Sequence, residues 1–599
     1  MVAVRVSPFG GMVPAVDDRL LPDANSALSQ DTWLYSGTAI GLPTPKNIHT
    51  LTNTNAAKVY RIPNNYRDAT HFSDSIWMEF ASADTDVIRT AVVGDTYDRY
   101  YWVSPLDVPR YFPLANIVIS APALTGAYKL GVPAPLGTLI AVPSGGASAT
   151  LKSVAYVQTF VSAYGEEGPP TSPVSLTGVK IDATVTITLR AADPNDLGVN
   201  RNLTKLRIYR TVTSTAGVAS YFFVAEMPIA TASYADSATD AVVALNASLL
   251  STDWSGPPSD LQGMVSLANG MVVAFRANEL WFCEPFRMHA WPAKYTLVTE
   301  YPIIGLGVSN QTLVVTTSGF AYTGTGLNPG SFSLSKLPGL LPCTSRGSIV
   351  STVDGVYFSA PAGLVLVSPR GVTIATKNLI NKDKWLNLVA TSTLRAAQLG
   401  DAYFAFGQAR FGVFEVTAFD TASFAQQDFS GATRGVLIDV NNASVAFNLM
   451  ASSLPVVNIQ ADAWSTELYI IRGGQVLWLD IGDTTQVKNS FIWRSKIYEP
   501  ARKHNFQAAK IYFRVPTNTP TQNSVVTVGS PQTLQSGQYG LFRVYADGNL
   551  VMTREIRTSG EQWRLPSGFK ADFWQFEIES RVEILNLQVA TSATELSGI

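Results

Sequence analysis

The chain has 599 residues, of which 46% are hydrophobic and 15% are charged, and its net charge is −2. This length and apolar content exclude a single small domain, a disordered chain and a coiled coil. Tight binding to nucleic acid is disfavoured, because no long stretch is basic enough to attract the phosphate backbone. No segment approaches the roughly 20 apolar residues that cross a bilayer, so we expect no membrane-spanning segment.

Strands are expected to dominate, because Lys and Glu, which favour helices, are scarce. The first 16 residues are interrupted by Ser7-Pro8 and Gly10-Gly11 and lack the apolar core of a signal peptide. Cysteine is limited to Cys283 and Cys343, too few for a disulfide framework or a paired zinc site. We therefore expect a chain that is made in the cytoplasm and keeps two buried free thiols.

Residues 1–127 are predicted to contain an N-terminal segment and the first blade or blades of a β-propeller. Within this region the run 75–80 predicts a strand that turns at Asp84–Asp86 into a second strand beginning at Val87. Residues 128–250 form a block of their own, bounded by prolines, with several short strands and turn signals. That pattern predicts an inserted β-sandwich, which resembles a fibronectin type III module.

Residues 251–500 repeat one pattern, in which two β-rich runs flank a tight turn. Successive turns lie about 40 residues apart, the period of β-propeller blades with several strands each. The turns are at 277–278, 318–319, 354–355, 400–401, 441–442 and 473–474. These residues are therefore predicted to supply the remaining blades.

Residues 501–599 are predicted to form a separate C-terminal β-domain. Apolar residues alternate along 509–515 and 574–578, and Asp547-Gly548 marks a hairpin turn. The uncharged segment 517–540 is interpreted as an extended flexible hairpin, with an ordered inter-subunit or channel-lining loop as the alternative. The fold class is therefore all-β: a β-propeller interrupted by a fibronectin III-like β-sandwich, plus a C-terminal β-domain.

Two common catalytic motifs are absent from the sequence, and other catalytic triads stay open but have no support in it. The dipeptide Gly-Lys does not occur, which excludes a P-loop, and no Gly-x-Ser-x-Gly nucleophile elbow is present. The segment 324–330 is interpreted as a turn rather than a dinucleotide fingerprint. Cys283 and His289 are close enough in sequence to form a nucleophile and its base, but we interpret them as a buried strand end.

Three pairs of carboxylates are candidates for glycosidase residues, because propellers can carry paired acids. They are Asp84 with Asp86, Glu166 with Glu167, and Glu577 with Glu579. Each pair is interpreted as solvated structure in a turn or on a strand. Asp193–Asp196 is interpreted as a turn rather than a calcium loop. We therefore predict no catalytic, cofactor-binding or metal-binding residue and no cofactor.

Several segments together resemble the tail nozzle proteins (tail tubular protein B-like) of short-tailed bacteriophages. The resemblance covers most of the chain and rests on segments 7–14, 20–24, 42–46, 257–263, 269–275, 282–286, 289–292, 343–349, 356–365, 564–568 and 574–578.

The resemblance implies a structural, non-enzymatic virion protein located in the phage tail and assembled in the host cytoplasm. It implies a ring, a hexamer, beneath the portal-adaptor, whose lumen is the channel through which genomic DNA passes non-specifically during ejection. Tail fibres or tailspikes are further expected partners. The alternative is a glycan-binding or glycan-degrading propeller protein of the tail.

Overall fold

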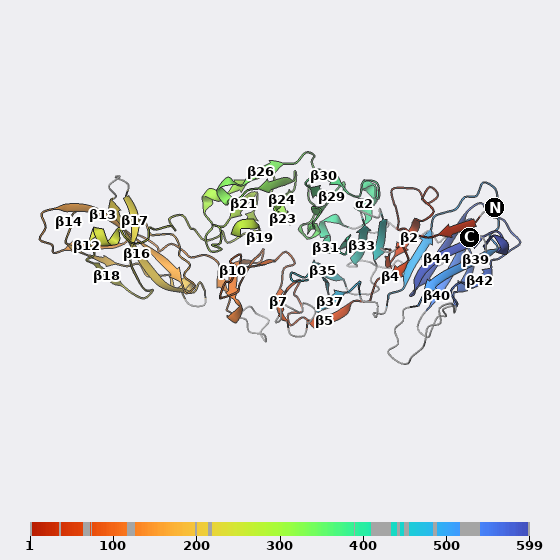
Figure 1. Cartoon of the computed structure of the whole chain (residues 1–599), viewed down its shortest axis with the longest axis horizontal. Helices are drawn as coiled ribbons and strands as arrows, with labels where there is room; N and C mark the ends of the chain where they lie inside the picture. The colour runs from red at the N-terminus through yellow and green to blue at the C-terminus, as the bar shows by residue number, and fades with distance from the viewer. Residues whose placement is uncertain are drawn as a thin grey trace. The chain divides into compact units, whose positions relative to one another are not determined.

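Strands make up nearly all of the regular structure in the computed structural model of the chain (Figure 1). The structure describes residues 3–34, 37–63, 72, 75–116, 126–197, 200–213, 219–388, 390–408, 433–439, 444–448, 455–465, 467–482, 488–515 and 539–596. In these ranges the α-helices are short: α1 (Asp240–Val243), α2 (Lys382–Leu388) and α3 (Ala593–Leu596). The all-β prediction is confirmed. Most of the 517–540 segment lies outside the described residues.

The chain divides into two compact units, Phe80–Leu337 and a second unit that combines Met1–Glu79 with Pro338–Ile599. In Phe80–Leu337, three sheets are antiparallel meanders of four consecutive strands. The first contains β8 (Asp86–Arg89), β9 (Arg99–Ser104), β10 (Asp107–Pro113) and β11 (Tyr128–Lys129). The second contains β19 (Gln262–Ser266), β20 (Val272–Arg276), β21 (Glu279–Phe282) and β22 (Leu297–Val298). The third contains β23 (Ile303–Ser309), β24 (Thr312–Thr317), β25 (Tyr322–Thr325) and β26 (Ser333–Lys336).

Two further sheets of this unit pack around one apolar core that includes Tyr156, Ile187 and Ile208. One sheet has the order β12 (Ile140–Ser144), β15 (Thr184–Thr188), β18 (Ser233–Asp236). The other has the order β14 (Val174–Lys180), β13 (Leu151–Ser162), β16 (Leu203–Thr213), β17 (Ala219–Pro228). Residues 140–236 thus form a two-layer β-structure inside the predicted insertion.

The second unit also has two four-stranded antiparallel sheets, each of which shares an apolar core with residues between 394 and 445. One contains β27 (Val350–Ser351), β28 (Val356–Ala360), β29 (Gly363–Ser368) and β30 (Gly371–Ile374). The other contains β35 (Val456–Ala461), β36 (Leu468–Arg472), β37 (Gln475–Leu479) and, as its fourth strand, β5 (Lys46–Thr50). Strand β5 pairs antiparallel with β37, so a segment near the start of the chain completes a sheet made late in it.

Nine strands of the same unit form one continuous sheet. Its order is β31 (Arg395–Leu399), β32 (Ala402–Gln408), β33 (Thr433–Asp439), β34 (Ser444–Asn448), β2 (Ser26–Gln30), β38 (Phe491–Ser495), β43 (Trp574–Ser580), β40 (Gly540–Ala546) and β41 (Asn549–Glu555). Strand β2 is parallel to β34 and antiparallel to β38. It therefore joins the β31–β34 meander to the C-terminal strands.

A four-stranded sheet lies against the C-terminal half of the nine-stranded sheet, and both contribute to one core. Its order is β1 (Ala3–Val6), β44 (Glu583–Ala590), β39 (Ala508–Arg514), β42 (Gln562–Arg564), and Figure 1 shows the last three side by side. The predicted alternation is confirmed, because Ile511 and Phe513 are buried while Arg514 is exposed. The unit also has two two-stranded sheets, β3 (Thr32–Trp33) with β4 (Ile40–Gly41) and β6 (Lys58–Ile62) with β7 (Ile76–Phe80).

The hairpins predicted at five of the six turns of 251–500 are confirmed by antiparallel pairing of the flanking strands. The sixth predicted turn, 441–442, lies outside the described residues, although β33 and β34 pair antiparallel. The hairpin predicted across Asp84–Asp86 is wrong. Strand β7 pairs with β6, whereas β8 pairs with β9 through Val87 opposite Trp102 and Ile88 opposite Tyr101. The turn residues fit many kinds of turn, and burial of the aromatic β9 decides which strand β8 joins.

Candidate functional site

The predicted insertion leaves and rejoins the rest of its unit at one point. Gly131 has a φ of +95°, and a Cβ atom there would lie 2.7 Å from the Cα atom of Gly256. Arg201, from within the insertion, donates hydrogen bonds to the carbonyls of Leu130 and Gly131 at 3.2 and 3.0 Å. The incoming and outgoing segments therefore run side by side, as a domain inserted into a loop requires.

A buried charge cluster lies at this root of the insertion, and we treat it as the candidate site. Arg99 at the start of β9 donates from Nε to Asp95 Oδ2 at 2.8 Å and from Nη1 to Glu166 Oε1 at 2.6 Å. Glu166 follows β13 of the insertion and is 8% exposed. The ion pair thus fastens the insertion to the β8–β11 sheet.

His289 lies on the other side of Glu166. Its Nδ1 atom is 3.8 Å from Glu166 Oε1, and the residue is 4% exposed. Burial lowers the pKa of His289, and the nearby Arg287 and Arg99 add to this effect while Glu166 opposes it. The imidazole is therefore neutral near pH 7, and its Nε2 atom has no hydrogen-bond partner among the described residues.

Aromatic rings enclose this cluster. The guanidinium of Arg99 lies 5.8 Å from the ring of Tyr97 and 5.7 Å from that of Tyr164. Trp254 packs edge-on against His289, with ring centroids 5.9 Å apart. Arg99 therefore already contacts the aromatic rings and the carboxylates that an external cation would need. Its contacts instead connect segments of this unit to one another.

Cys283 does not join His289 in a nucleophilic pair. Its Sγ atom accepts a hydrogen bond from the Val272 N–H at 3.3 Å, and the residue is fully buried. Burial raises the pKa of the thiol to about 12, so the thiolate needed for attack is not formed near neutral pH. The interpretation of this segment as a buried strand end is confirmed.

The interpretation of Glu166 and Glu167 as solvated is wrong. Glu167 accepts hydrogen bonds from Thr159 Oγ1 at 2.6 Å and Tyr209 Oη at 2.8 Å, and it pairs with Arg207 at 2.9 Å. Both carboxylates are satisfied by groups that come together only in the fold. Hydrogen bonds from cationic and hydroxyl groups replace the water that burial removes from these carboxylates.

Glu577 and Glu579 are also bound in a network rather than solvated. Arg494 Nε donates to Glu577 Oε2 at 2.6 Å, and Arg543 bridges both carboxylates at 2.6 Å each. Tyr539 adds a hydrogen bond to Glu579 at 3.0 Å. The network links β38, β43 and β40 across one face of the nine-stranded sheet.

The remaining candidate acids have structural positions. Asp193 caps a 3₁₀ turn by accepting from the Asn195 N–H, and Asp196 pairs with Arg201 at 2.5 Å, as expected for a turn. Asp84 lies in the segment between β7 and β8, where its N–H donates to Ser82 Oγ. The segment 324–330 begins in the last two residues of β25 and continues into a 3₁₀ turn at Pro329–Ser331 before β26, which agrees with its interpretation as a turn between strands.

The other histidines are dispersed. His49 Nε2 lies 2.9 Å from Glu79 Oε1, and its ring stacks on Trp77. His504 Nδ1 lies 3.1 Å from the carbonyl oxygen of Lys503, and His71 lies outside the described residues. Across the described ranges no group of three His, Cys, Asp or Glu side chains could hold a metal ion. Among the same residues, no helix is both long and apolar enough to cross a bilayer.

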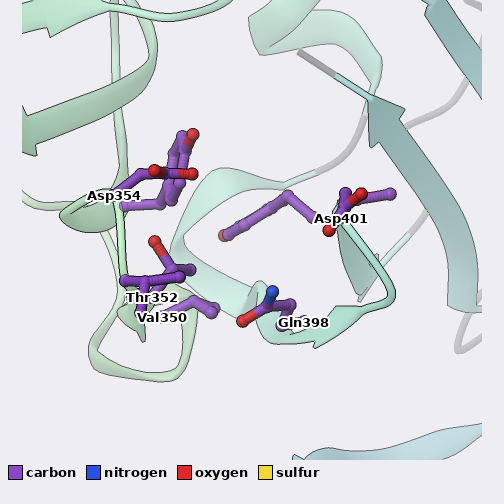
Figure 2. Close-up of a pocket in the computed structure, with 9 residues that line it drawn as sticks. Val350, Thr352, Asp354, Gln398 and Asp401 are labelled. Atoms are coloured by element: carbon purple, nitrogen blue, oxygen red, sulfur yellow. The ribbon is translucent and has the colours of Figure 1, made fainter. Parts of the chain in front are cut away.

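A small hollow lies between the turns β27–β28 and β31–β32 (Figure 2). Asp354 and Asp401 stand on opposite sides of it, with Thr352 and Gln398 between them. Its cavity volume of about 50 Å³ is far below the several hundred Å³ of a typical ligand pocket. The hollow has room for water molecules rather than for a sugar or a cofactor.

No family model and no curated protein matches the chain. Alignments to solved structures include BBS1N in complex with ARL6DN (10% identity, 50% of this chain and 88% of that chain, TM-score 0.24). They also include Hsv2 of Kluyveromyces marxianus (8%, 55% and 89%, TM-score 0.23) and PorZ of the type-IX secretion system of Porphyromonas gingivalis (12%, 69% and 46%, TM-score 0.23). TM-scores this low establish no shared fold.

Proposed function

We propose that this chain is a structural subunit of the tail nozzle of a short-tailed bacteriophage. Six copies form a ring beneath the portal-adaptor, and the genome leaves through the lumen. The observation that carries the proposal, besides the sequence resemblance, is the way the two ends of the chain are joined. Strands β1, β2 and β5 each complete a sheet whose other strands come from residues 395–590.

The pairing of early strands with late ones is expected to help a subunit resist mechanical force. Strand β2 lies inside the nine-stranded sheet, with hydrogen-bonded neighbours on both sides. Strand β5 is held by β37, and β1 by β44. Strand β2 therefore cannot be peeled away from one side, whereas β1 and β5 are edge strands with one hydrogen-bonded neighbour each. A subunit that withstands DNA under pressure benefits from an early strand that is held on both sides within a late sheet.

The proposal also includes two fold assignments, a β-propeller and an inserted fibronectin III-like sandwich. Meanders of four antiparallel strands are the unit from which β-propellers are built, and they support the propeller. The two-layer structure of residues 140–236 supports the fibronectin III-like sandwich. Glycan hydrolysis, the alternative, gains no support from Glu577 and Glu579, because arginines bind both carboxylates.

The test is the assembled mass of the purified full chain, measured by mass photometry over a range of concentrations, with cryo-EM of the same sample. We expect particles of six times the subunit mass of 64.5 kDa that average to rings with sixfold symmetry. The same measurement is repeated with tails isolated from virions, where rings should lie on the tail axis. A chain that stays monomeric and is absent from that axis would overturn the proposal.

A further inference from the structure

The outward face of the sheet β1-β44-β39-β42 carries four basic side chains, which we name the basic face: Arg5, Lys510, Arg514 and Arg564. The strand register aligns part of it in one row. Arg5 lies opposite Gln588, Gln588 opposite Lys510, and Lys510 opposite Gln562. Neighbouring strands are about 4.8 Å apart, so Arg5 and Lys510 are about 10 Å apart along the row.

The alternation of each strand fixes which way these side chains point. Val4, Ile511, Phe513 and Trp563, the sequence neighbours of the basic residues, lie in the apolar core beneath the sheet. Because successive residues of a strand face opposite sides, the basic residues face outward. Arg5, Arg514 and Arg564 are exposed, and Lys510 is half-buried.

The charge on this face differs in sign from that of the whole chain. The four strands contain four basic residues and one acid, Glu583, which pairs with Arg514 at 3.2 Å. The helix α3, which packs on β39 and β44, adds Glu595, whose carboxylate accepts a hydrogen bond from Thr591 Oγ1. Counting both acids, the face keeps a net positive charge, whereas the chain has a net charge of −2.

Neutral donors accompany the cations. Gln562 and Asn586 lie on the same face, and the Nζ atom of Lys510 is 4.7 Å from the ring centre of Tyr512. Amide, hydroxyl, Lys and Arg groups are the ones that proteins use on phosphate oxygens and sugars. An acidic peptide would require only the charges, so the added amides favour a sugar-phosphate backbone.

We propose that the basic face binds the phosphate backbone of nucleic acid without sequence preference. This inference adds a DNA-contacting surface to the proposed function. It rests on that proposal in one respect, since the nozzle function is what identifies the bound nucleic acid as the outgoing genome. With no more than four contacts, the binding is weak and strongly dependent on salt. The slope of log K against log[salt] should be no steeper than about −3.6, since each phosphate contact contributes about −0.9.

The experiment measures the fluorescence anisotropy of a labelled 30-base-pair duplex with the full chain between 50 and 200 mM KCl. The test variant is R5Q/K510Q/R564Q. We expect it to bind at least tenfold more weakly at 50 mM KCl, with a slope reduced by about 2.7. The matched control, R370Q/K377Q/K382Q, removes the same charge from exposed positions elsewhere in this unit and should change the affinity less than twofold.

Three results would overturn the inference. The first is an equal loss of affinity in the test and control variants, and the second is no binding by the wild-type chain at 50 mM KCl. The third is displacement of the duplex by polyglutamate at the same charge concentration, which would assign the face to acidic polypeptides. If the triple variant does not keep the wild-type melting temperature, the single variants K510Q and R564Q are used, each with an expected slope change of about 0.9.

The failure of this inference is distinguishable from failure of the proposed function. Rings that do not bind the duplex would overturn the basic face alone. A monomer that binds the duplex through these residues would leave the basic face intact and overturn the ring.

Discussion

His289 Nδ1 lies 3.8 Å from Glu166 Oε1, although these residues belong to different predicted domains, 251–500 and 128–250. Because the buried imidazole is neutral near pH 7, the two side chains lie side by side without an ion pair. The inserted block is bound here by the ion pair of Glu166 with Arg99. The stability of this junction should therefore depend on pH and on each charged member.

Acid should weaken the junction through His289. Burial lowers its pKa in the folded state, so the unfolded chain, with a His pKa of about 6.5, binds the proton more readily. Stability from this group is fully present above about pH 6.5 and is lost as the pH falls below it. We expect the melting temperature of H289Q to depend less on pH between 7 and 5 than that of the wild type. H504Q, at a half-exposed site, is the control and should follow the wild type. Identical pH profiles for H289Q and the wild type would contradict the assignment.

Removing one partner of the Arg99–Glu166 pair should lower the free energy of unfolding. E166Q leaves the largely buried Arg99 with Asp95 alone, and breaking a buried pair costs about 3 to 5 kcal/mol. The triple variant D95N/R99M/E166M removes all three charges and should lose less than E166Q, as measured by urea unfolding followed with circular dichroism. A triple variant that is less stable than E166Q would show that the charges are not paired as described.

The glycine at the root of the insertion should resist substitution. G131A places a Cβ atom 2.7 Å from the backbone of Gly256 at a φ of +95°. Both strain and overlap act there, so we expect a loss of about 1 to 3 kcal/mol in the free energy of unfolding. G256A is the matched control, because its Cβ atom would meet nothing closer than 3.5 Å, and it should be milder. Equal effects would show that the approach is not tight.

Both thiols should be unreactive in the folded chain. Cys283 and Cys343 are buried, and the pKa of Cys283 is raised to about 12. With Ellman's reagent at pH 8 we expect no rapid reaction in buffer and two thiols in 6 M guanidinium chloride. Rapid reaction of one thiol in buffer, located by mass spectrometry at Cys283, would reopen a nucleophilic role.

Sequence patterns predicted those parts of the fold that depend on neighbouring residues. The turn at Gly473-Gly474 and the alternation along 509–515 are local, and the structure has both. The pairing of β5 with β37 was not predictable, because nothing in either strand identifies a partner so distant in sequence. The hairpin predicted across Asp84–Asp86 was wrong for the same reason, because nothing in the sequence of a strand identifies its pairing partner.

The candidate site was predictable only in part. The sequence indicated Glu166 and His289 as separate candidates and gave no signal for Arg99 or Asp95, whose contacts form only where the insertion joins the rest of its unit. The basic face was missed, because Arg5, Lys510 and Arg564 come from three strands of one sheet that are far apart in sequence. The pattern of charges along the sequence does not indicate a cluster that forms only when distant strands pair in one sheet.

The early strand β5 also sets an order of events during synthesis. Its partner β37 leaves the ribosome more than 400 residues later, which at 5 to 20 residues per second is a delay on the order of tens of seconds. During this time β5, and likewise β1 and β2, have no sheet to join. This unit therefore reaches its final structure only after its strands between residues 395 and 590 have been made, and a product truncated before residue 395 would retain three unpaired strands.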